Sequence, residues 1–168
     1  MHPYPHLYVA SASGQPTGTV GVTAPGLPAI TTAPPAQFDG PGDVWSPETL
    51  LCASIADCFI LTFRAMARAS RFEWTGLTCR VEGVLEKADG AAQFTRYTTY
   101  ATLEIPPSGD ATKARALMEK AEHGCLVAAS LRGDGFDVAA FRPRTLAPSD
   151  LARAARVVAM GVDPGDTG

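Results

Sequence analysis

Positively charged side chains are scarce in this sequence. The first 63 residues contain no lysine or arginine, and the 14 basic residues of the chain are scattered over the rest, against 17 acidic ones. A surface that binds nucleic acid needs clustered lysine and arginine. With a net charge of −3 and no such cluster, the sequence predicts no nucleic-acid partner.

Metal ligands are also few. The chain has only three histidines, and its four cysteines form no C-x-x-C pair; they are Cys52, Cys58, Cys79 and Cys125. Structural zinc sites use closely spaced cysteine and histidine ligands, so we expect no metal site. We predict that the cysteines are thiols in a reducing compartment rather than structural disulfides.

Long apolar runs and a targeting signal are missing too. The first ten residues, MHPYPHLYVA, have neither a basic region nor a sustained apolar one, and no apolar run approaches the roughly 20 residues that span a bilayer. We therefore expect no membrane association and a cytoplasmic location. A length of 168 residues suits one domain, residues 1–168, without a second catalytic module.

One helix dominates the pattern that is present. Ser46 is a good N-cap and Pro47 suits the first helical position. From Leu50 to Phe63 the chain is apolar except for Ser54, Asp57 and Thr62. Apolar residues on nearly every side of a helix indicate that protein surrounds it. The sequence thus predicts a core helix from Ser46 to Ser70, with Cys58 inside it.

Shorter elements are expected on both sides of this helix. A meander of short strands should precede it, around Val20–Thr23 and Ile30–Thr32. Two long antiparallel strands, Leu77–Lys87 and Ala92–Ile105, should follow, joined by a turn at Asp89-Gly90. Beyond them we expect a helix from Gly109-Asp110 to about His123 and a second helix over Cys125–Leu131. A strand over Val138–Phe141 and a small helix over Leu151–Met160 should follow, before a disordered tail.

A reactive thiol on this helix would need help to ionise. Free cysteine has a pKa of about 8.5, and lowering it by ~2 units requires roughly 2.7 kcal/mol in favour of the thiolate. Cys58 is near mid-helix, too far from the helix N-terminus to use its dipole. Asp57 would oppose ionisation unless it pairs with Arg64. Glu48 precedes Cys58 by ten residues, about 15 Å along a regular helix, so a shared site requires a bent helix or a second subunit.

Two segments carry a family resemblance. The run FDGPGDVWSPETLLCASIADCF and the later HGCLVAASL resemble the OsmC/Ohr family of organic hydroperoxide reductases, from about Leu7 to about Pro143. The resemblance implies an α+β OsmC-like fold, with curved antiparallel sheets wrapped around a long central helix in an intertwined homodimer whose active sites lie at the subunit interface. It also implies that Cys58 is the peroxidatic cysteine, Cys125 the resolving cysteine and Glu48 a site residue. The core would cover about 7–143, and a C-terminal helix and tail about 148–168.

The sequence departs from that family in two places. Peroxidase members have an arginine in the N-terminal strand region that pairs with the glutamate and stabilises the thiolate, and this chain has none there. Leu126 stands where proline commonly follows the second cysteine. Five side chains are candidates for the missing cation: Arg64, Arg96, His123, Arg132 and Arg142.

Three functions remain open from the sequence. The leading hypothesis is a thiol-dependent peroxidase that reduces fatty or alkyl hydroperoxides through Cys58 and Cys125, needs no metal or flavin, and is regenerated by an external dithiol such as a lipoyl group or another thiol. Its main rival is a non-catalytic OsmC-like protein that binds a small apolar ligand at the dimer interface. A thiol-dependent hydrolase or an acyl carrier-like activity through Cys58 is the third. Buried cysteine is often only a small hydrophobe, which is the role expected for Cys52 and Cys79.

Overall fold

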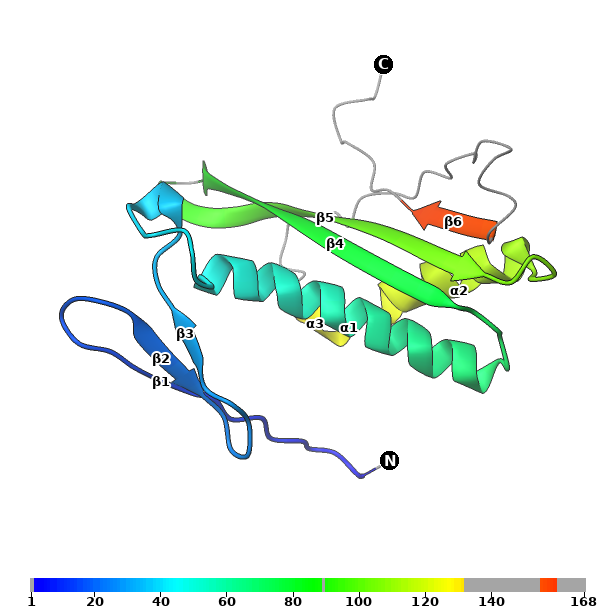
Figure 1. Ribbon diagram of the computed structural model, residues 1–168, viewed down its shortest axis with the longest axis horizontal. Coiled ribbons are helices and arrows are strands. Elements are labelled where there is room, and N and C mark those ends of the chain that lie inside the picture. The colour runs from blue at the N-terminus through cyan, green and yellow to red at the C-terminus, as the bar shows by residue number, and fades with distance from the viewer. Residues whose placement is uncertain (1, 89, 132–154, 160–168) are drawn as a thin grey trace, which may run out of the picture. The chain divides into compact units, whose positions relative to one another are not determined.

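The computed structural model describes residues 2–88, 90–131 and 155–159. The chain falls into two compact units, Met1–Leu51 (unit 1) and Cys52–Gly168 (unit 2). The expectation of a single domain remains a prediction. The long helix α1, Pro47–Ala69, begins in unit 1 and continues through unit 2 (Figure 1).

Unit 1 is a small meander. Three strands, β1 (Ser11–Ser13), β2 (Val20–Thr23) and β3 (Ile30–Thr32), pair antiparallel in the order β1-β2-β3. A single 3₁₀ turn, η1 (Ala36–Phe38), then leads toward α1. Gly40 follows this turn, and a Cβ there would lie 1.7 Å from the Pro34 carbonyl oxygen. Only glycine allows that close approach of two backbone segments, so Gly40 shapes the loop before the helix.

Both ends of α1 have local causes. At the start, Ser46 Oγ accepts a hydrogen bond from the Thr49 N–H at 3.2 Å, and Thr49 Oγ1 accepts one from the Ser46 N–H at 2.9 Å. This reciprocal pairing satisfies helix N–H groups that have no partner within the helix. At the other end, Arg71 adopts a positive φ of 50° and the Phe72 N–H donates to the Ala67 carbonyl at 2.8 Å. That is a Schellman termination, here without glycine.

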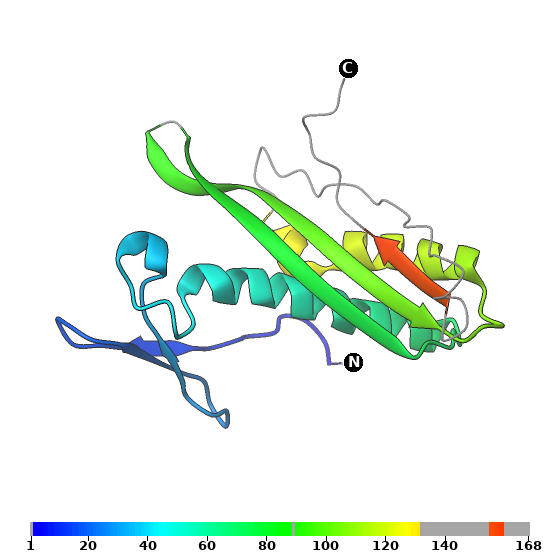
Figure 2. The ribbon, with the colours of Figure 1, turned by 45° about the horizontal axis from the view of Figure 1, so that its top comes forward.

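Unit 2 places helices on one face of an antiparallel sheet. Strand β4 (Gly76–Ala88) pairs with β5 (Ala91–Ile105) along its whole length, and β5 pairs with β6 (Ala155–Ala159). Figures 1 and 2 show α1 and α2 (Ala111–Gly124) on the same side of this sheet. A short helix, α3 (Leu126–Ser130), follows α2.

The hydrophobic core lies between the sheet and the two helices. Its fully buried members include Phe63 of α1, Leu103 of β5 and Ala121 of α2. Phe63 also meets the Trp74 ring edge to face at 5.4 Å. Helices and sheet thus bury one apolar face each, which is the ordinary way that a layered α+β unit excludes water.

Among the described residues, the buried side chains of α1 form one stripe. The stripe consists of Ile55, Phe59, Phe63 and Ala67, spaced four residues apart, whereas Leu61 on another side is 48% exposed. The described residues of one chain thus cover one side of the helix, and the expectation that protein surrounds it stays a prediction. In the described part of the chain, α1 is the one helix whose length and composition would allow it to cross a membrane, a test that the core helix of a soluble protein also passes.

Most predicted elements are confirmed, and one is wrong. The strands at Val20–Thr23 and Ile30–Thr32 agree with the structure, and both long strands and α2 agree to within a residue or two. The helix expected over Leu151–Met160 is instead strand β6 over Ala155–Ala159, because the edge of β5 offers backbone hydrogen-bond partners to this valine-containing segment. The strand expected at Val138–Phe141 lies outside the described residues, as do the remaining positions of the expected helix.

Candidate active site

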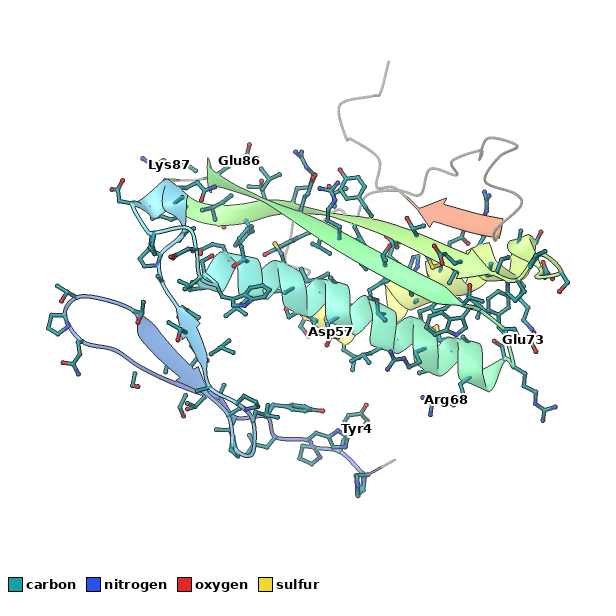
Figure 3. The ribbon with its side chains drawn as sticks, viewed as in Figure 1. Tyr4, Asp57, Arg68, Glu73, Glu86 and Lys87 are labelled. Carbon is teal, nitrogen blue, oxygen red and sulfur yellow. The ribbon has the colours of Figure 1, made fainter. Side chains whose placement is uncertain are left out.

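Cys58 lies on α1, on the helix that supplies the core stripe. Its neighbour Phe59 points into the core, while Cys58 itself is half-buried. The Cys58 sulfur lies 4.0 Å from the hydroxyl oxygen of Thr62, one helical turn further on. Asp57 is exposed and lies on the side of α1 that faces away from β4 and β5 (Figure 3). Cys58 therefore combines a packed environment with a route to solvent.

Cys125 occupies the junction between α2 and α3. It is the C-cap of α2 and the N-cap of α3, and it is only 2% exposed. Its sulfur lies 3.9 Å from the Ile55 carbonyl oxygen of α1. Tertiary packing thus brings Cys125 against the turn of α1 that precedes Cys58, and the two thiols form a hydrogen-bonded pair.

The two thiols differ in acidity. Burial raises the pKa of Cys58, but hydrogen bonds from the Val127 N–H, the Cys125 thiol, the Thr62 hydroxyl and the Leu126 N–H outweigh it, so the pKa lies below its ordinary value. Burial raises the pKa of Cys125 to about 11, and the neighbouring Cys58 adds to that rise. Cys58 therefore ionises first, and the Cys125 thiol donates a hydrogen bond to the resulting thiolate.

The groups that favour the Cys58 thiolate are uncharged. Among the described residues no Arg, Lys or His lowers the pKa of Cys58. His123 uses its Nδ1 atom in a 2.8 Å hydrogen bond with the Glu119 carbonyl of its own helix. Arg64 and Arg96 therefore do not fill the place of the missing cation within the described chain, and Arg132 and Arg142 lie outside it. The expected Asp57–Arg64 pair is absent as well, since the salt bridge of the described residues joins Arg80 and Glu82.

The other two cysteines stay protonated. Burial raises the pKa of Cys79 to about 12, with a further contribution from Cys125, and its side chain packs against the core. Burial also raises the pKa of Cys52, whose sulfur lies beside Gly83 of β4. Both environments suit the packing role that the sequence predicts for these two residues.

Glu48, the third predicted site residue, lies in unit 1. It lies in the first turn of α1, where a carboxylate complements the helix dipole. Its Oε2 atom is buried and has no hydrogen-bond partner in the part of the chain that the structure describes. The structure thus pairs two of the three predicted site residues, Cys58 and Cys125, and leaves the role of Glu48 a prediction.

The model of the OsmC-like protein family matches residues 40–139, which include α1, both long strands and both predicted redox cysteines. This chain belongs to the OsmC-like family. The α+β OsmC-like fold expected from the resemblance is confirmed.

Solved OsmC-like structures share this fold. An organic hydroperoxide resistance protein OsmC from Legionella pneumophila is 25% identical, with a TM-score of 0.65 over 81% of this chain and 96% of that one. The OsmC-like protein of unknown function VCA0330 from Vibrio cholerae is 14% identical, with a TM-score of 0.71 over 79% of this chain and 97% of that one. Uncharacterized protein YmaD of Bacillus subtilis is 24% identical over 132 residues, 77% of this chain and 88% of YmaD. The chain is therefore an OsmC/Ohr family protein with relatives named for hydroperoxide resistance.

The sequence alone missed three groups that act on the Cys58 sulfur. Thr62 could have been found, because a residue four positions on in a helix lies on the same face. The N–H groups of Leu126 and Val127 could not, because their position depends on how α3 packs against α1. Within this OsmC-like site, hydrogen-bond donors are thus contributed by α1 and by the start of α3.

The difference in acidity predicts an order of alkylation. With excess iodoacetamide at pH 7.5, we expect Cys58 to react well before Cys125, because only the thiolate is nucleophilic. Mass spectrometry of tryptic peptides after timed quenching would measure both rates. The Cys125 rate should keep rising toward pH 11, whereas the Cys58 rate should level off at lower pH. Equal rates for the two cysteines at pH 7.5 would contradict the assignment.

Proposed function

We propose that this protein is a thiol-dependent peroxidase that reduces organic hydroperoxides, with Cys58 as the peroxidatic cysteine and Cys125 as the resolving cysteine. The observation that carries the proposal is a pair of hydrogen-bonded thiols whose pKa values are displaced in opposite directions. A nucleophile that ionises readily next to a thiol that stays protonated is the arrangement that two-cysteine peroxide reduction needs.

The chemistry follows from this pair. The Cys58 thiolate attacks the terminal oxygen of the hydroperoxide, the O–O bond breaks, and the alkoxide takes a proton and leaves as an alcohol. Cys58 becomes sulfenic acid. The Cys125 sulfur then attacks the sulfenic sulfur, a disulfide forms, and water leaves. An external dithiol, such as a lipoyl group, reduces the disulfide and returns both thiols. These steps require no metal or flavin.

Apolar side chains next to the thiols favour an organic substrate. Leu126, adjacent to Cys125 in sequence, is 71% exposed, and Leu61, one turn from Cys58 on α1, is 48% exposed. Both can contact an alkyl chain while the peroxide group meets the Cys58 sulfur. Relatives from Legionella pneumophila and Elizabethkingia anophelis are described as organic hydroperoxide resistance proteins, which supports the same substrate class.

We also propose a homodimer in the cytoplasm. Leu61, an exposed leucine of α1, suits burial against a second copy, and such a copy could bring its own Glu48 to the thiol pair. The four free cysteines suit a reducing compartment. The dimer, the location and the dithiol reductant are parts of this proposal.

Thiol titration tests the proposal. One equivalent of cumene hydroperoxide should remove two titratable thiols per chain, and a dithiol should restore both. Peptide mapping should then locate the disulfide between Cys58 and Cys125. Loss of no thiol would overturn the proposal, and a disulfide involving Cys52 or Cys79 would overturn the assignment of the resolving residue.

The rival function is a non-catalytic protein that binds a small apolar ligand. It is favoured by the absence of lysine and arginine before Arg64, which removes the cation expected beside a peroxidatic thiolate in this family. Under this alternative the four thiols remain titratable after peroxide is added. The same titration therefore separates the two functions.

A further inference from the structure

One side of α1 carries a row of exposed side chains, most of them charged. This helix row consists of Asp57, Leu61, Arg64 and Arg68. Its members follow one another at steps of four, three and four residues, which keeps them within about 60° around the helix axis. Leu61 is 48% exposed, and Figure 3 shows Asp57 and Arg68 on the side of α1 that faces away from β4 and β5. The helix row is therefore a surface of the single chain.

The charges of the helix row are ordered along the helix. The negative charge, on Asp57, lies at one end, and the positive charges, on Arg64 and Arg68, lie at the other. Asp57 and Arg64 are about 10 Å apart along the axis, whereas side chains of one helix meet at separations of three or four residues. The salt bridge found among the described residues lies on β4, so the helix row has no salt bridge there. Its charges are thus available to a second molecule.

This order of charges is self-complementary in one orientation. If α1 of a second copy packs antiparallel, Asp57 lies opposite the partner subunit's Arg64, and the two-fold axis repeats the pair. Leu61 then lies near that axis, where it meets its own counterpart. If the two helices pack parallel, aspartate faces aspartate and arginine faces arginine, and the like charges repel each other. The helix row therefore favours the antiparallel orientation, and its spacing favours one register.

We propose that the helix row joins two copies of this chain, with the two α1 helices antiparallel, Leu61 near the two-fold axis, and an ion pair between Asp57 and the partner subunit's Arg64 on each side. The inference rests on the homodimer of the proposed function and names the contact that orients its two copies. Exposed ion pairs add little affinity, so these pairs set the orientation and the register, while buried apolar area supplies most of the stability. Arg68 extends the positive end by one turn and increases the repulsion in the parallel orientation.

This contact can be tested apart from the thiol chemistry. The side chains of the helix row are not among the groups that act on the Cys58 sulfur. Failure of the thiol titration would therefore leave the contact intact. A dimer that lacks the ion pairs would overturn the inference and leave the homodimer of the proposed function intact. A chain that is monomeric at every concentration would overturn both, and the thiol titration would still decide the Cys58–Cys125 chemistry.

A zero-length cross-link on the full chain tests the pairing in solution. Arg64→Lys keeps the positive charge and supplies an amine, which a carbodiimide joins to a carboxylate as an amide with loss of water. In a mixture of isotope-labelled and unlabelled chains, we expect peptides that join position 64 of one copy to Asp57 of the other. Asp57→Asn should abolish this product, whereas Glu73→Gln, at another exposed carboxylate of unit 2 (Figure 3), should leave it unchanged. A sedimenting dimer without this product would overturn the inference.

Charge reversal measures how much the pairing contributes to association. Arg64→Glu places a carboxylate opposite Asp57 twice in a symmetric dimer, and should weaken association about tenfold or more in sedimentation over a dilution series. Combining it with Asp57→Arg restores opposite charges and should return the affinity to within about threefold of the unaltered chain. Arg115→Glu makes the same charge change at an exposed residue of α2 and should leave association unchanged. A double variant that associates as weakly as Arg64→Glu alone would overturn the inference.

Discussion

Replacing Cys58 with serine is expected to lower the rate of cumene hydroperoxide reduction by about 10³-fold or more, as removal of a catalytic nucleophile does. Serine is nearly isosteric but is not ionised at neutral pH. The donors that lower the pKa of Cys58 would then face a neutral hydroxyl that cannot attack the O–O bond. The rate can be followed as peroxide consumed in the presence of excess dithiothreitol.

The matched control is Cys52→Ser. It makes the same atom exchange in the same helix, at a thiol whose raised pKa keeps it protonated. We expect its rate to stay within about twofold of the unaltered chain, because Cys52 is not among the groups that act on the Cys58 sulfur. A Cys58→Ser protein as active as the control would remove the basis of the proposed mechanism.

Cys125→Ser separates the two chemical steps. It keeps Cys58, so the first equivalent of peroxide should still be consumed and leave a sulfenic acid that dimedone traps. Turnover with a dithiol that reduces only disulfides should stop, because no disulfide can form. Unimpaired turnover in that assay would mean that another thiol resolves the sulfenic acid.

The largest expected effect on stability comes from Leu103→Ala. Leu103 is fully buried, in register with Leu77 of β4, in the centre of the core cluster. Truncating such a leucine removes hydrophobic contacts and leaves a cavity, which costs about 2.5–5 kcal/mol. For a chain of this size that corresponds to a fall in Tm of roughly 5–20 °C. Thermal unfolding followed by circular dichroism would measure it.

Leu85→Ala is the control for this change. It truncates the same residue type on the neighbouring strand β4, where the Leu85 side chain is already 38% exposed. We expect the free energy of unfolding to fall by about 1 kcal/mol or less, because folding removes less of the Leu85 side chain from water than of the Leu103 side chain. Equal losses for the two variants would mean that the core of unit 2 is not centred on β5.

Local signals predicted most of the fold. Ser46 and Pro47 marked the start of α1 because a capping side chain and a residue without an N–H suit a helix N-terminus regardless of what packs nearby. The long strands were predictable because Leu77–Lys87 alternates and Asp89-Gly90 favours a turn. The C-terminal segment was not, because Ala155–Ala159 is a strand only where the edge of β5 is available to pair with it.

The candidate site was predictable in part, through a family resemblance rather than through local structural signals. Cys58 and Cys125 were chosen because their flanking residues resemble a family, and the structure brings them together. The expected cation was not found in the described chain; hydrogen bonds from Val127, Leu126 and Thr62 favour the thiolate instead. Backbone N–H groups are present at almost every residue, so no sequence pattern could indicate which of them meet the sulfur.

By itself the sequence determined the core helix, the two long strands and the shortage of positive charge near the N-terminus, because each depends on residues that are close neighbours in the chain. The tertiary structure alone decided that the Cys58 and Cys125 thiols are hydrogen-bonded, that one is more acidic than the other, and that a carboxylate oxygen of Glu48 is buried without a donor among the described residues. Those properties arise from desolvation and from hydrogen bonds between distant segments, and both exist only once the chain has packed.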